Sequence, residues 1–448
     1  MTTTYDPFHP AYFDESDLRE EMNRVYDLCH GCRLCFKFCS SFPTLFEFID
    51  AHDDQDAARL TPAQQNQVVD ECFQCKLCYV NCPYIPGQSE WELDFPRLMM
   101  RSEQVLRRTR PAPIRQKLTD KALGSTDLVG RIGSAAAPLA NASIRTPGSA
   151  IRGLIEKTAG ISKVRVLPPF SRQRFSTWFG RRGPVGAAEL GPARRPDKVA
   201  ALFPTCLVEY QDTQVGKDLV GVYERNGIEC RLPDGEVCCG APMLHQGDVE
   251  GFRRNARKNI SLLASTLRHA HGRGEDLDIV VPQPTCGYIL KKDYVDYVGG
   301  ADAELVANHT FDAAEYLMDI HRADKAAGGT GLDTGFTGPV PETTTYHAPC
   351  HLRAQNIGLR SRDLMKLTGT KLTVVAECSG IDGTWGLRAE NLDLSRRAAS
   401  KMASEITKAG SEAVAGDCSL ANGGIVLETG TQPVHPLSLV ARAYGIEP

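Results

Sequence analysis

Two cysteine motifs near the start of the chain constrain its fold more than any other feature. Both place two residues between the first three cysteines and three residues before the fourth: Cys29-x2-Cys32-x2-Cys35-x3-Cys39 and Cys72-x2-Cys75-x2-Cys78-x3-Cys82. Three cysteines at this spacing can surround one cluster, because the turns between them direct their thiolates toward a common volume. A set of unrelated buried thiols does not explain why the same cysteine spacing occurs twice.

This is the spacing of bacterial ferredoxins, in which the fourth cysteine of each motif ligates the neighbouring cluster. The sequence therefore predicts two [4Fe-4S] clusters. One is expected on Cys29, Cys32, Cys35 and Cys82, and the other on Cys72, Cys75, Cys78 and Cys39. Zinc, which also binds Cys-x2-Cys pairs, is the alternative, although it does not require four cysteines in this rhythm.

The cysteine content and the N-terminal sequence indicate where the protein is located. The chain has 16 cysteines, and its N-terminus lacks a basic segment followed by an apolar core. No run approaches the ~20 apolar residues of a membrane-spanning helix. We therefore expect a cytoplasmic protein whose reduced thiols bind metal, with a peripheral position at the inner face of the membrane as a further option. A net charge of -4 argues against a nucleic-acid partner.

The chain divides into segments of different composition. Residues 1–100 hold both motifs and are expected to form a mainly α-helical, two-cluster domain of bacterial ferredoxin type. Residues 101–196 lack cysteine and are basic, which predicts a helical or linker region. Residues 197–323 and 344–448 follow, and the Gly-, Thr- and Pro-rich segment 324–343 between them predicts a flexible link.

The last two segments repeat one pattern. In each, a first strand ends at a cysteine (Cys206, Cys350), a cysteine and glycine motif follows (Cys238-Cys239-Gly240, Cys378-Ser379-Gly380), and a third strand ends at a cysteine (Cys286, Cys418). Strands alternating with helices predict a parallel α/β layer in each copy, so the overall class is an α+β multidomain protein. The cysteines fall where sites in parallel sheets form, at the ends of strands.

This repeated pattern resembles the cysteine-rich CCG domain of heterodisulfide-reductase-type proteins. Nearly the whole chain resembles the larger family that joins two ferredoxin motifs to two CCG domains. That family includes the fused heterodisulfide reductase subunit and the iron–sulfur subunits of anaerobic glycerol-3-phosphate dehydrogenase and glycolate oxidase. The second copy is especially similar, from Tyr346-His347-Ala348-Pro349-Cys350 to His435-Pro436-Leu437. The segment Trp91-Glu92-Leu93-Asp94-Phe95-Pro96 looks like a rubrerythrin-associated subgroup.

The chain departs from the family motif, which ends in Cys-x2-Cys. Neither Cys286 nor Cys418 has a second cysteine three residues away, and Ser379 replaces one cysteine of the adjacent pair. The first copy keeps four cysteines that can hold a third cluster: Cys206, Cys238, Cys239 and Cys286. The second keeps Cys350, Cys378 and Cys418, which can hold zinc, a further cluster completed by Ser379, Asp382 or Asp417, or nothing.

Several other residues carry weaker signals. Cys230 lies outside every motif and is expected to be a buried small hydrophobe. His245, His347 and His351 lie near motif cysteines, where they either pack or tune a cluster by hydrogen bonding. The basic stretch 101–183, with four acidic residues, is interpreted as a solvated linker, and contact with an acidic partner or an anionic membrane surface is the alternative.

The resemblance implies an iron–sulfur oxidoreductase subunit that carries electrons from a flavoprotein or reduced carrier, through two clusters, to a CCG-domain site and on to a quinone or redox protein. A flavoprotein dehydrogenase or a rubrerythrin-type protein is the expected partner. No Gly-x-Gly-x-x-Gly follows a strand, so we expect no bound FAD or NAD, and no catalytic residue is assigned. Two alternatives stay open: a self-contained heterodisulfide reductase acting at a CCG-domain cluster, and a zinc-holding structural subunit.

Overall fold

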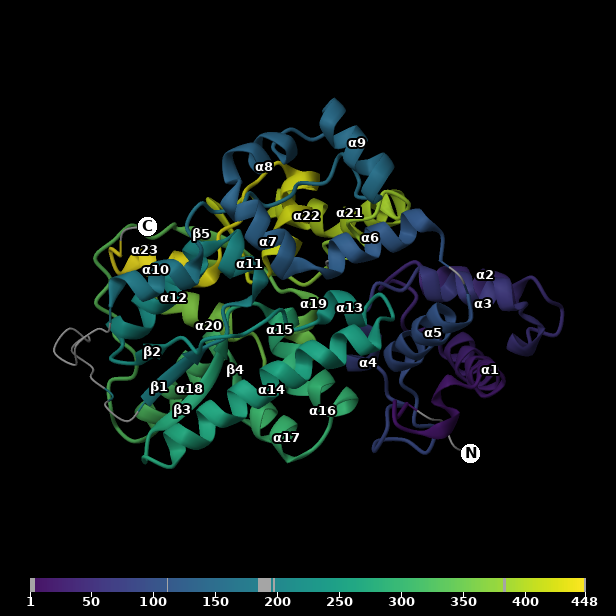
Figure 1. Ribbon diagram of the computed structural model, residues 1–448, viewed down its shortest axis with the longest axis horizontal. Helices are drawn as coiled ribbons and strands as arrows, with labels where there is room; N and C mark the ends of the chain where they lie inside the picture. The colour runs from purple at the N-terminus through teal and green to yellow at the C-terminus, as the bar shows by residue number, and fades with distance from the viewer. Residues whose placement is uncertain (1–4, 111, 184–194, 196–197, 382–383, 447–448) are drawn as a thin grey trace.

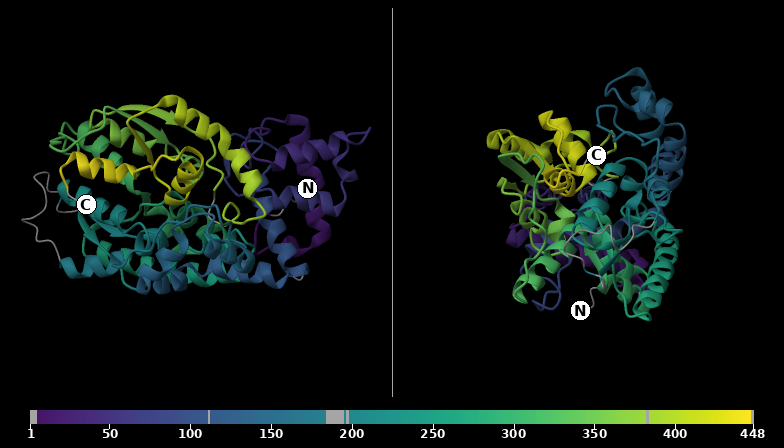
Figure 2. Two further views of the ribbon diagram at one scale, coloured as in Figure 1. Left: turned by 90° about the horizontal axis from the view of Figure 1, so that it is seen from above. Right: turned by 90° about the vertical axis from the view of Figure 1, so that its left-hand side faces the viewer.

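The computed structural model describes residues 5–110, 112–183, 195, 198–381 and 384–446. A helical N-terminal domain lies at one end of the molecule (Figure 1). Seen from above, the two repeated copies lie beside each other along the remaining length (Figure 2). The molecule is therefore an α+β multidomain protein, as the sequence predicts.

The N-terminal domain is built from short helices. Their bounds are η1 Pro10–Phe13, α1 Glu15–Cys32, α2 Ser41–Asp50, η2 Ala57–Arg59, α3 Pro62–Asp70, α4 Leu77–Val80 and α5 Phe95–Thr109. Local signals define their starts: the Asp14 side chain accepts hydrogen bonds from the first turn of α1, and Thr61 and Gln64 form a capping box on α3. The apolar faces of α1, α2, α3 and α5 close over one core.

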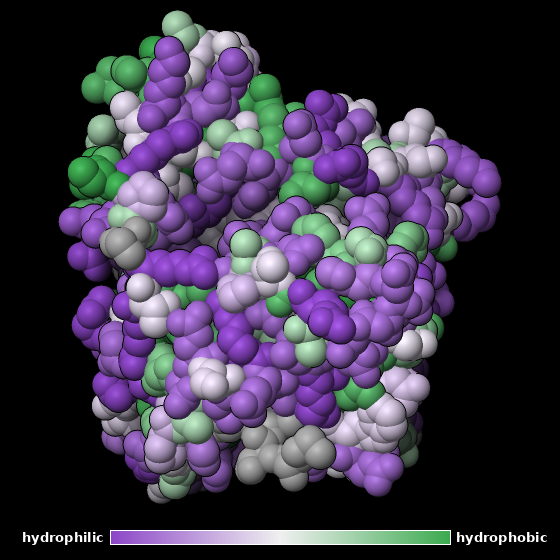
Figure 3. Space-filling model, turned by 90° about the vertical axis from the view of Figure 1, so that its right-hand side faces the viewer, coloured by the Kyte–Doolittle hydropathy of each residue, from purple (hydrophilic) through white to green (hydrophobic). Residues whose placement is uncertain are grey.

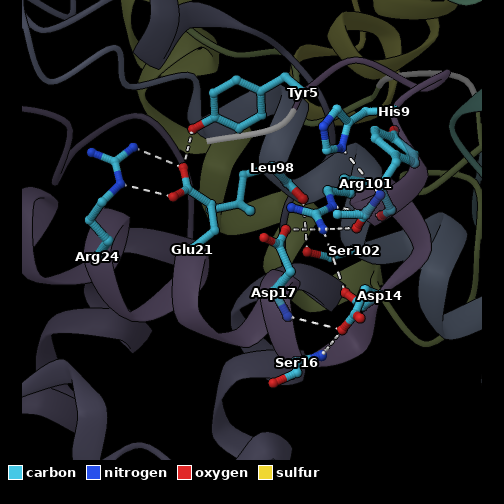
Figure 4. A network of polar contacts seen from close by, with 12 residues as sticks. Tyr5, His9, Asp14, Ser16, Asp17, Glu21, Arg24, Leu98, Arg101 and Ser102 are labelled. Carbon is cyan, nitrogen blue, oxygen red and sulfur yellow. Dashed lines mark hydrogen bonds and ion pairs between the residues drawn. The ribbon is translucent and has the colours of Figure 1, made fainter. Parts of the chain in front are cut away.

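A buried arginine fastens this domain together (Figure 4). The Arg101 side chain has no exposed surface, and its guanidinium donates to the carbonyl oxygens of Ala11 and Tyr12, both at 2.7 Å. It also contacts Asp17 Oδ2 at 2.6 Å. One α5 side chain thus binds both the first 3-10 turn and the start of α1.

The basic region is helical and packed. Its helices are α6 Ile114–Gly124, α7 Thr126–Ala135, α8 Ala137–Ile144, α9 Ala150–Ala159 and α10 Phe175–Arg182. Asp120 accepts from Arg107 at 2.9 Å and from Arg388 at 2.5 Å, and the Ala389 N–H donates to the Gly160 carbonyl at 2.8 Å. The interpretation of residues 101–183 as a solvated linker is therefore wrong, because this region covers both copies (Figure 1).

The first copy is built on a parallel sheet of order β2-β1-β3-β4. Its strands are β1 Lys198–Leu202, β2 Glu229–Arg231, β3 Asp276–Val281 and β4 Thr310–Asp312. Its helices are α11 Thr205–Tyr210, α12 Thr213–Arg225, α13 Ala241–Leu244, α14 Val249–His271, α15 Pro284–Tyr288, the π-helical turn η3 Ile289–Asp293, α16 Tyr294–Tyr297, α17 Ala301–Asn308 and α18 Ala313–Ala326. The predicted alternation of strands and helices is confirmed.

The second copy has a smaller parallel sheet of order β6-β5-β7. Its elements are β5 Thr343–His347, α19 Cys350–Ala354, α20 Arg360–Lys366, β6 Lys371–Val375, α21 Leu392–Ala409, β7 Ala413–Gly416, α22 Ser419–Thr429 and α23 Pro436–Ala443. Side chains of both copies share one apolar core, which includes Leu202 and Val280 from the first and Tyr346 and Leu437 from the second. This shared core fixes the two copies against each other.

The segment between the copies is irregular but not free. Leu332 is buried in the shared core, and the Asp333 N–H donates to Asn226 Oδ1 at 2.8 Å. The prediction of a flexible link is therefore wrong for this part of the segment. Within the described part of the chain, no helix combines the length and apolar character needed to span a bilayer.

Candidate functional site

The first N-terminal thiol group forms where α1 ends. Arg33 takes a left-handed conformation with φ of 53°, and its N–H donates to the Cys29 carbonyl at 2.8 Å. This stop turns the chain so that the cysteines after the helix fold back toward its last turn. Burial, followed by the neighbouring thiols of Cys35, Cys82 and Cys32, raises the pKa of the Cys29 thiol well above its usual value. The structure thus brings together the four cysteines assigned to one cluster, including Cys82 from the other motif.

The second group forms around the loop before α4. Gln74 and Lys76 have φ of 55° and 62°, and these left-handed turns allow three cysteines of one motif to converge. Burial raises the pKa of Cys78, and the nearby thiols of Cys75, Cys72 and Cys39 add to this rise. A small cavity is lined by Cys39, Cys72, Cys75 and Cys78 together with Phe38, Phe42, Phe73 and Phe95. The crossed arrangement expected from the spacing is present in the placement of the thiols.

These two groups fit iron–sulfur clusters better than single ions. Among the described residues, no three Cys, His, Asp or Glu side chains converge closely enough to hold one metal ion. A cubane needs a wider ring, since each thiolate ligates a different iron. Backbone and side-chain donors aim at sulfur: the Tyr84 N–H lies 3.4 Å from Cys82 Sγ, and Gln74 Nε2 lies 3.7 Å from Cys72 Sγ. Such donors stabilise thiolate ligands.

The four cysteines of the first copy meet at the carboxyl end of its sheet. Cys206 follows β1 in α11, Cys286 follows β3 in α15, and Cys239 Sγ lies 3.2 Å from Cys286 Sγ. Cys238 accepts hydrogen bonds from the thiols of Cys206 and Cys239, which lower its pKa well below the usual value. The four thiols are thus linked by successive contacts, from Cys206 through Cys238 and Cys239 to Cys286.

Residues distant in sequence hold this group in place. The Cys238 N–H donates to Asp127 Oδ2 of α7 at 2.8 Å, and Tyr294 OH donates to the Cys239 carbonyl at 3.2 Å. Asn259 Nδ2 donates to the Val237 carbonyl at 2.9 Å. Sequence reasoning missed these supporting residues, because nothing in the pattern links α7 or α14 to the adjacent cysteines.

The second copy brings its cysteines together less completely. Cys350 begins α19 after β5, and its thiol is in hydrogen-bonding contact with that of Cys378. Cys418 follows β7 and lies near Cys286 of the first copy, whose thiol contributes to the raised pKa of Cys418, about 11, after the larger effect of burial.

The proposed oxygen ligands of the second copy have different positions. Both carboxylate oxygens of Asp417 are used in the core, by Tyr346 OH at 2.6 Å and by the Ser361 hydroxyl. Asp417 is therefore held in the core by two hydrogen bonds. Ser379 is buried, and Asp382 lies outside the described residues.

A glycine marks equivalent positions in the two copies. Gly240 has φ of 92° and its N–H lies 3.5 Å from Cys238 Sγ, whereas Gly380 has φ of 71° and its N–H lies 3.2 Å from Cys378 Sγ. A Cβ on Gly240 would lie 2.7 Å from Phe252 Cδ2, and one on Gly380 would lie 2.2 Å from a backbone oxygen. Only glycine fits both the backbone angle and the space, so each cysteine keeps its backbone donor.

The N-terminal domain docks on the second copy at its second thiol group. The thiols of Cys75 and Cys350 are in hydrogen-bonding contact, which is the largest cause of the raised pKa of Cys75. Trp385 Nε1 donates to the Asp70 carbonyl at 2.6 Å, and its ring packs 5.2 Å from that of Phe73. The loop of Cys72 to Cys78 is therefore held against the cysteines of the second copy.

His351 joins all three parts at this junction. Its Nε2 lies 2.8 Å from the Gln74 carbonyl in the N-terminal domain, and its Nδ1 lies 2.9 Å from Thr285 Oγ1, next to Cys286. Burial lowers the pKa of His351 to about 4, and the nearby Lys76 charge contributes to this lowering. A neutral ring donates through one nitrogen and accepts through the other, which suits this pair of partners.

The remaining weaker signals are also settled by position. Cys230 is buried in the shared core, which confirms it as a packed hydrophobe. His347 is buried with Nε2 3.0 Å from the Glu377 carbonyl. His245 lies in ring contact with His351, and burial lowers its pKa well below the usual value.

Two family models match the chain, one over the N-terminal cysteine motifs and one over the two repeated copies. One, described as a 4Fe-4S dicluster domain, matches residues 21–83. The other, described as a cysteine-rich domain (CCG), matches residues 200–291 and 344–420. Both predicted domain types are thus confirmed.

Three curated proteins illustrate the relationship. The C-subunit of anaerobic glycerol-3-phosphate dehydrogenase from Escherichia coli (strain K12) is 29% identical over 334 residues, 73% of this chain and 78% of that protein. The B-subunit of fumarate reductase (CoM/CoB) from Methanothermobacter marburgensis is 29% identical over 230 residues, 50% of this chain and 41% of that protein. Lactate utilization protein A of Bacillus cytotoxicus is 29% identical over 199 residues, 42% of this chain and 74% of that protein.

Proposed function

Because the chain belongs to the iron–sulfur proteins that join a 4Fe-4S dicluster domain to cysteine-rich CCG domains, we propose that it is the electron-transfer subunit of a dehydrogenase or reductase complex. Its donor is a flavoprotein or reduced carrier, and its acceptor is a quinone or redox protein. When bound, the clusters supply one-electron carriers whose potentials depend on charge, hydrogen bonds and burial. The residues of the chain determine where those carriers sit and what reaches them.

The contact between Cys75 and Cys350 is the observation that carries this proposal. It places the thiol group of Cys75 against the second copy. The other thiol group, which includes Cys35, lies close to Cys75. Burial is the main cause of the raised pKa of Cys35, and the nearby Cys75 thiol is one of the neighbours that add to it. His351 continues the packed path to Thr285, which precedes Cys286 of the first copy. Close packing of successive sites is what a relay requires, and the fold supplies it without the cysteine-free region 101–196 in the path.

We assign the terminal site to the first copy, since it retains four cysteines whose thiols are linked by successive contacts, from Cys206 to Cys238, Cys239 and Cys286. A cleft of about 380 Å³ reaches Cys206 and Cys238 from the surface. A second cleft, of about 720 Å³, lies between the N-terminal domain and the second copy and reaches Cys39 and Cys378. The first suits a small acceptor near four thiols, and the second gives a partner access to the relay.

The alternatives differ in what they require of these sites. A self-contained heterodisulfide reductase would act at the first-copy cysteines without any partner, and the open cleft there is compatible with it. A zinc-holding structural subunit requires three or four ligands around one ion, and no such set occurs among the described residues. The geometry therefore favours the relay over the zinc-holding subunit.

The face made by α6–α9 suits contact with a membrane or a partner. Its eight exposed large apolar side chains are Ile114, Leu118, Leu128, Val129, Ile132, Leu139, Ile151 and Leu154. Figure 3 shows apolar surface on the projection at its upper left. Basic residues of the same helices accompany them, including Arg115 and Lys157. Mixed apolar and basic surface favours an anionic bilayer over a purely acidic protein. Sedimentation with anionic but not neutral vesicles would support this contact, and loss of binding in Leu139→Asp/Leu154→Asp would locate it.

The test of the proposed function is the iron, sulfide and zinc content of anaerobically purified protein, with EPR of its reduced and oxidised forms. About eight irons would support two [4Fe-4S] clusters, and about twelve would support a third. A signal lost in Cys239→Ser but kept in Cys230→Ser would place that third cluster in the first copy. Stoichiometric zinc, without any redox signal beyond the N-terminal pair, would contradict the assignment of a terminal redox site.

A further inference from the structure

A basic cavity lies beside the first copy, where α7 meets the segment leading into α10. Its volume is about 520 Å³, and its lining includes Arg131, Arg172, Arg174 and Arg181 but no aspartate or glutamate. Among the described residues, Arg172 and Arg181 have no carboxylate within ion-pair distance. Arg174 pairs with Glu209 at 3.8 Å, so the charges of Arg172 and Arg181 are the ones most available to attract an anion.

This cavity continues toward the cysteines of the first copy. Arg131 and Arg174 also line the neighbouring cleft of about 380 Å³, whose inner wall includes Cys206 and Cys238. Both volumes lie in the range of small-molecule sites. One molecule can therefore contact the arginines at one end and approach the thiols at the other.

A buried acid in the cleft is a second, independent observation. Glu236 lines the cleft two residues before Cys238, and its Oε1 is buried without a hydrogen-bond partner. A buried oxygen without a partner can accept a hydrogen bond from a molecule that enters the cleft.

We propose that the cavity and cleft form a binding site for a small organic anion, with its carboxylate or phosphate on the arginines and the rest of the molecule beside Cys206 and Cys238, next to the unpartnered Oε1 of Glu236. This inference rests on the proposed function in treating the first copy as the terminal site. Arginine is suited to the role, because its planar guanidinium binds carboxylate and phosphate through two parallel hydrogen bonds.

The test measures anion binding to the full-length, anaerobically purified protein by calorimetry at low ionic strength. The probes are inorganic phosphate and succinate, and the tighter one identifies the anionic group that the site prefers. We expect Arg172→Ala/Arg181→Ala to weaken binding about tenfold or more, which is ~1.4 kcal/mol. The matched control, Arg268→Ala/Arg273→Ala, removes the same charge at the far end of α14 and should change binding by less than about twofold. No saturable binding of either probe, or equal weakening by both double variants, would overturn the proposal.

These measurements follow binding alone, so their failure is distinct from a failure of the iron and EPR measurements.

Discussion

Replacing Gly240 by alanine should destabilise the first copy through two separable effects. The left-handed backbone at φ of 92° costs ~1–2 kcal/mol for a residue with a Cβ. The added Cβ would also lie 2.7 Å from Cδ2 of Phe252, which is fully buried, and such overpacking costs ~1–3 kcal/mol. The sum is ~2–5 kcal/mol in the free energy of unfolding.

Gly235 provides the matched control for this substitution. It lies in the same loop with φ of 103°, but a Cβ there has no heavy atom within 4 Å. Gly235→Ala should therefore show only the backbone effect of ~1–2 kcal/mol, leaving ~1–3 kcal/mol for packing against Phe252.

Fluorescence of Trp178, which packs on Phe175 in the shared core, can report on the first copy. The chain has three tryptophans, so a common background of Trp91→Phe/Trp385→Phe removes the other signals. Urea unfolding in this background should give a lower midpoint for Gly240→Ala than for Gly235→Ala, with similar slopes. Equal midpoints would refute the view that close packing, and not only the backbone angle, requires glycine next to Cys238.

Three further outcomes follow from contacts elsewhere in the chain. Burial raises the pKa of Glu103 to about 8, above its unfolded value, so its contribution to stability is full below about pH 4.5 and falls as pH rises toward 8. Glu103→Gln should flatten the pH dependence of the unfolding free energy. The change should not exceed ~4 kcal/mol, because the side chain is only partly buried, and an unchanged slope would contradict the prediction. Arg101→Met should lower the stability of the N-terminal domain by ~3–5 kcal/mol in thermal unfolding, and adding Asp17→Asn should restore part of the loss. Trp385→Phe keeps an aromatic ring but removes the hydrogen bond to the Asp70 carbonyl, so amide exchange in residues 70–78 should quicken about fivefold, whereas Trp178→Phe should leave it unchanged.

The sequence predicts the parts of this fold that depend on local signals. The two cysteine motifs predict the N-terminal domain, because the spacing of the cysteines determines how the loops between them must turn. The repeated strands predict both parallel sheets, because an apolar run ending at a cysteine places that residue at the sheet's carboxyl edge. The crossed grouping of Cys82 with Cys29 follows from the same short spacing and agrees with the placement of the thiols.

Contacts between distant residues could not be predicted in this way. Asp127 holds the Cys238 N–H across 111 positions of sequence, and no periodicity of α7 reveals that partner. The basic region has a composition typical of a linker, yet Asp120 pairs with both Arg107 and Arg388 and so fixes it over the second copy. The composition of a segment gives its charge, but only the positions of its ion-pair partners show whether it packs against another part of the chain.

The two copies have diverged in a way that the docking contacts explain. In the second copy, Asp417 is committed to the core and Ser379 replaces a cysteine, so few groups are left to complete a cluster. The same copy supplies Cys350, His351 and Trp385, which hold the loop around Cys75. A surface that must fit another domain tolerates the loss of ligands, whereas a terminal site does not. The first copy keeps four thiols linked by successive contacts, an open cleft and the backbone donor of Gly240, and these features support the proposal that electron transfer ends there.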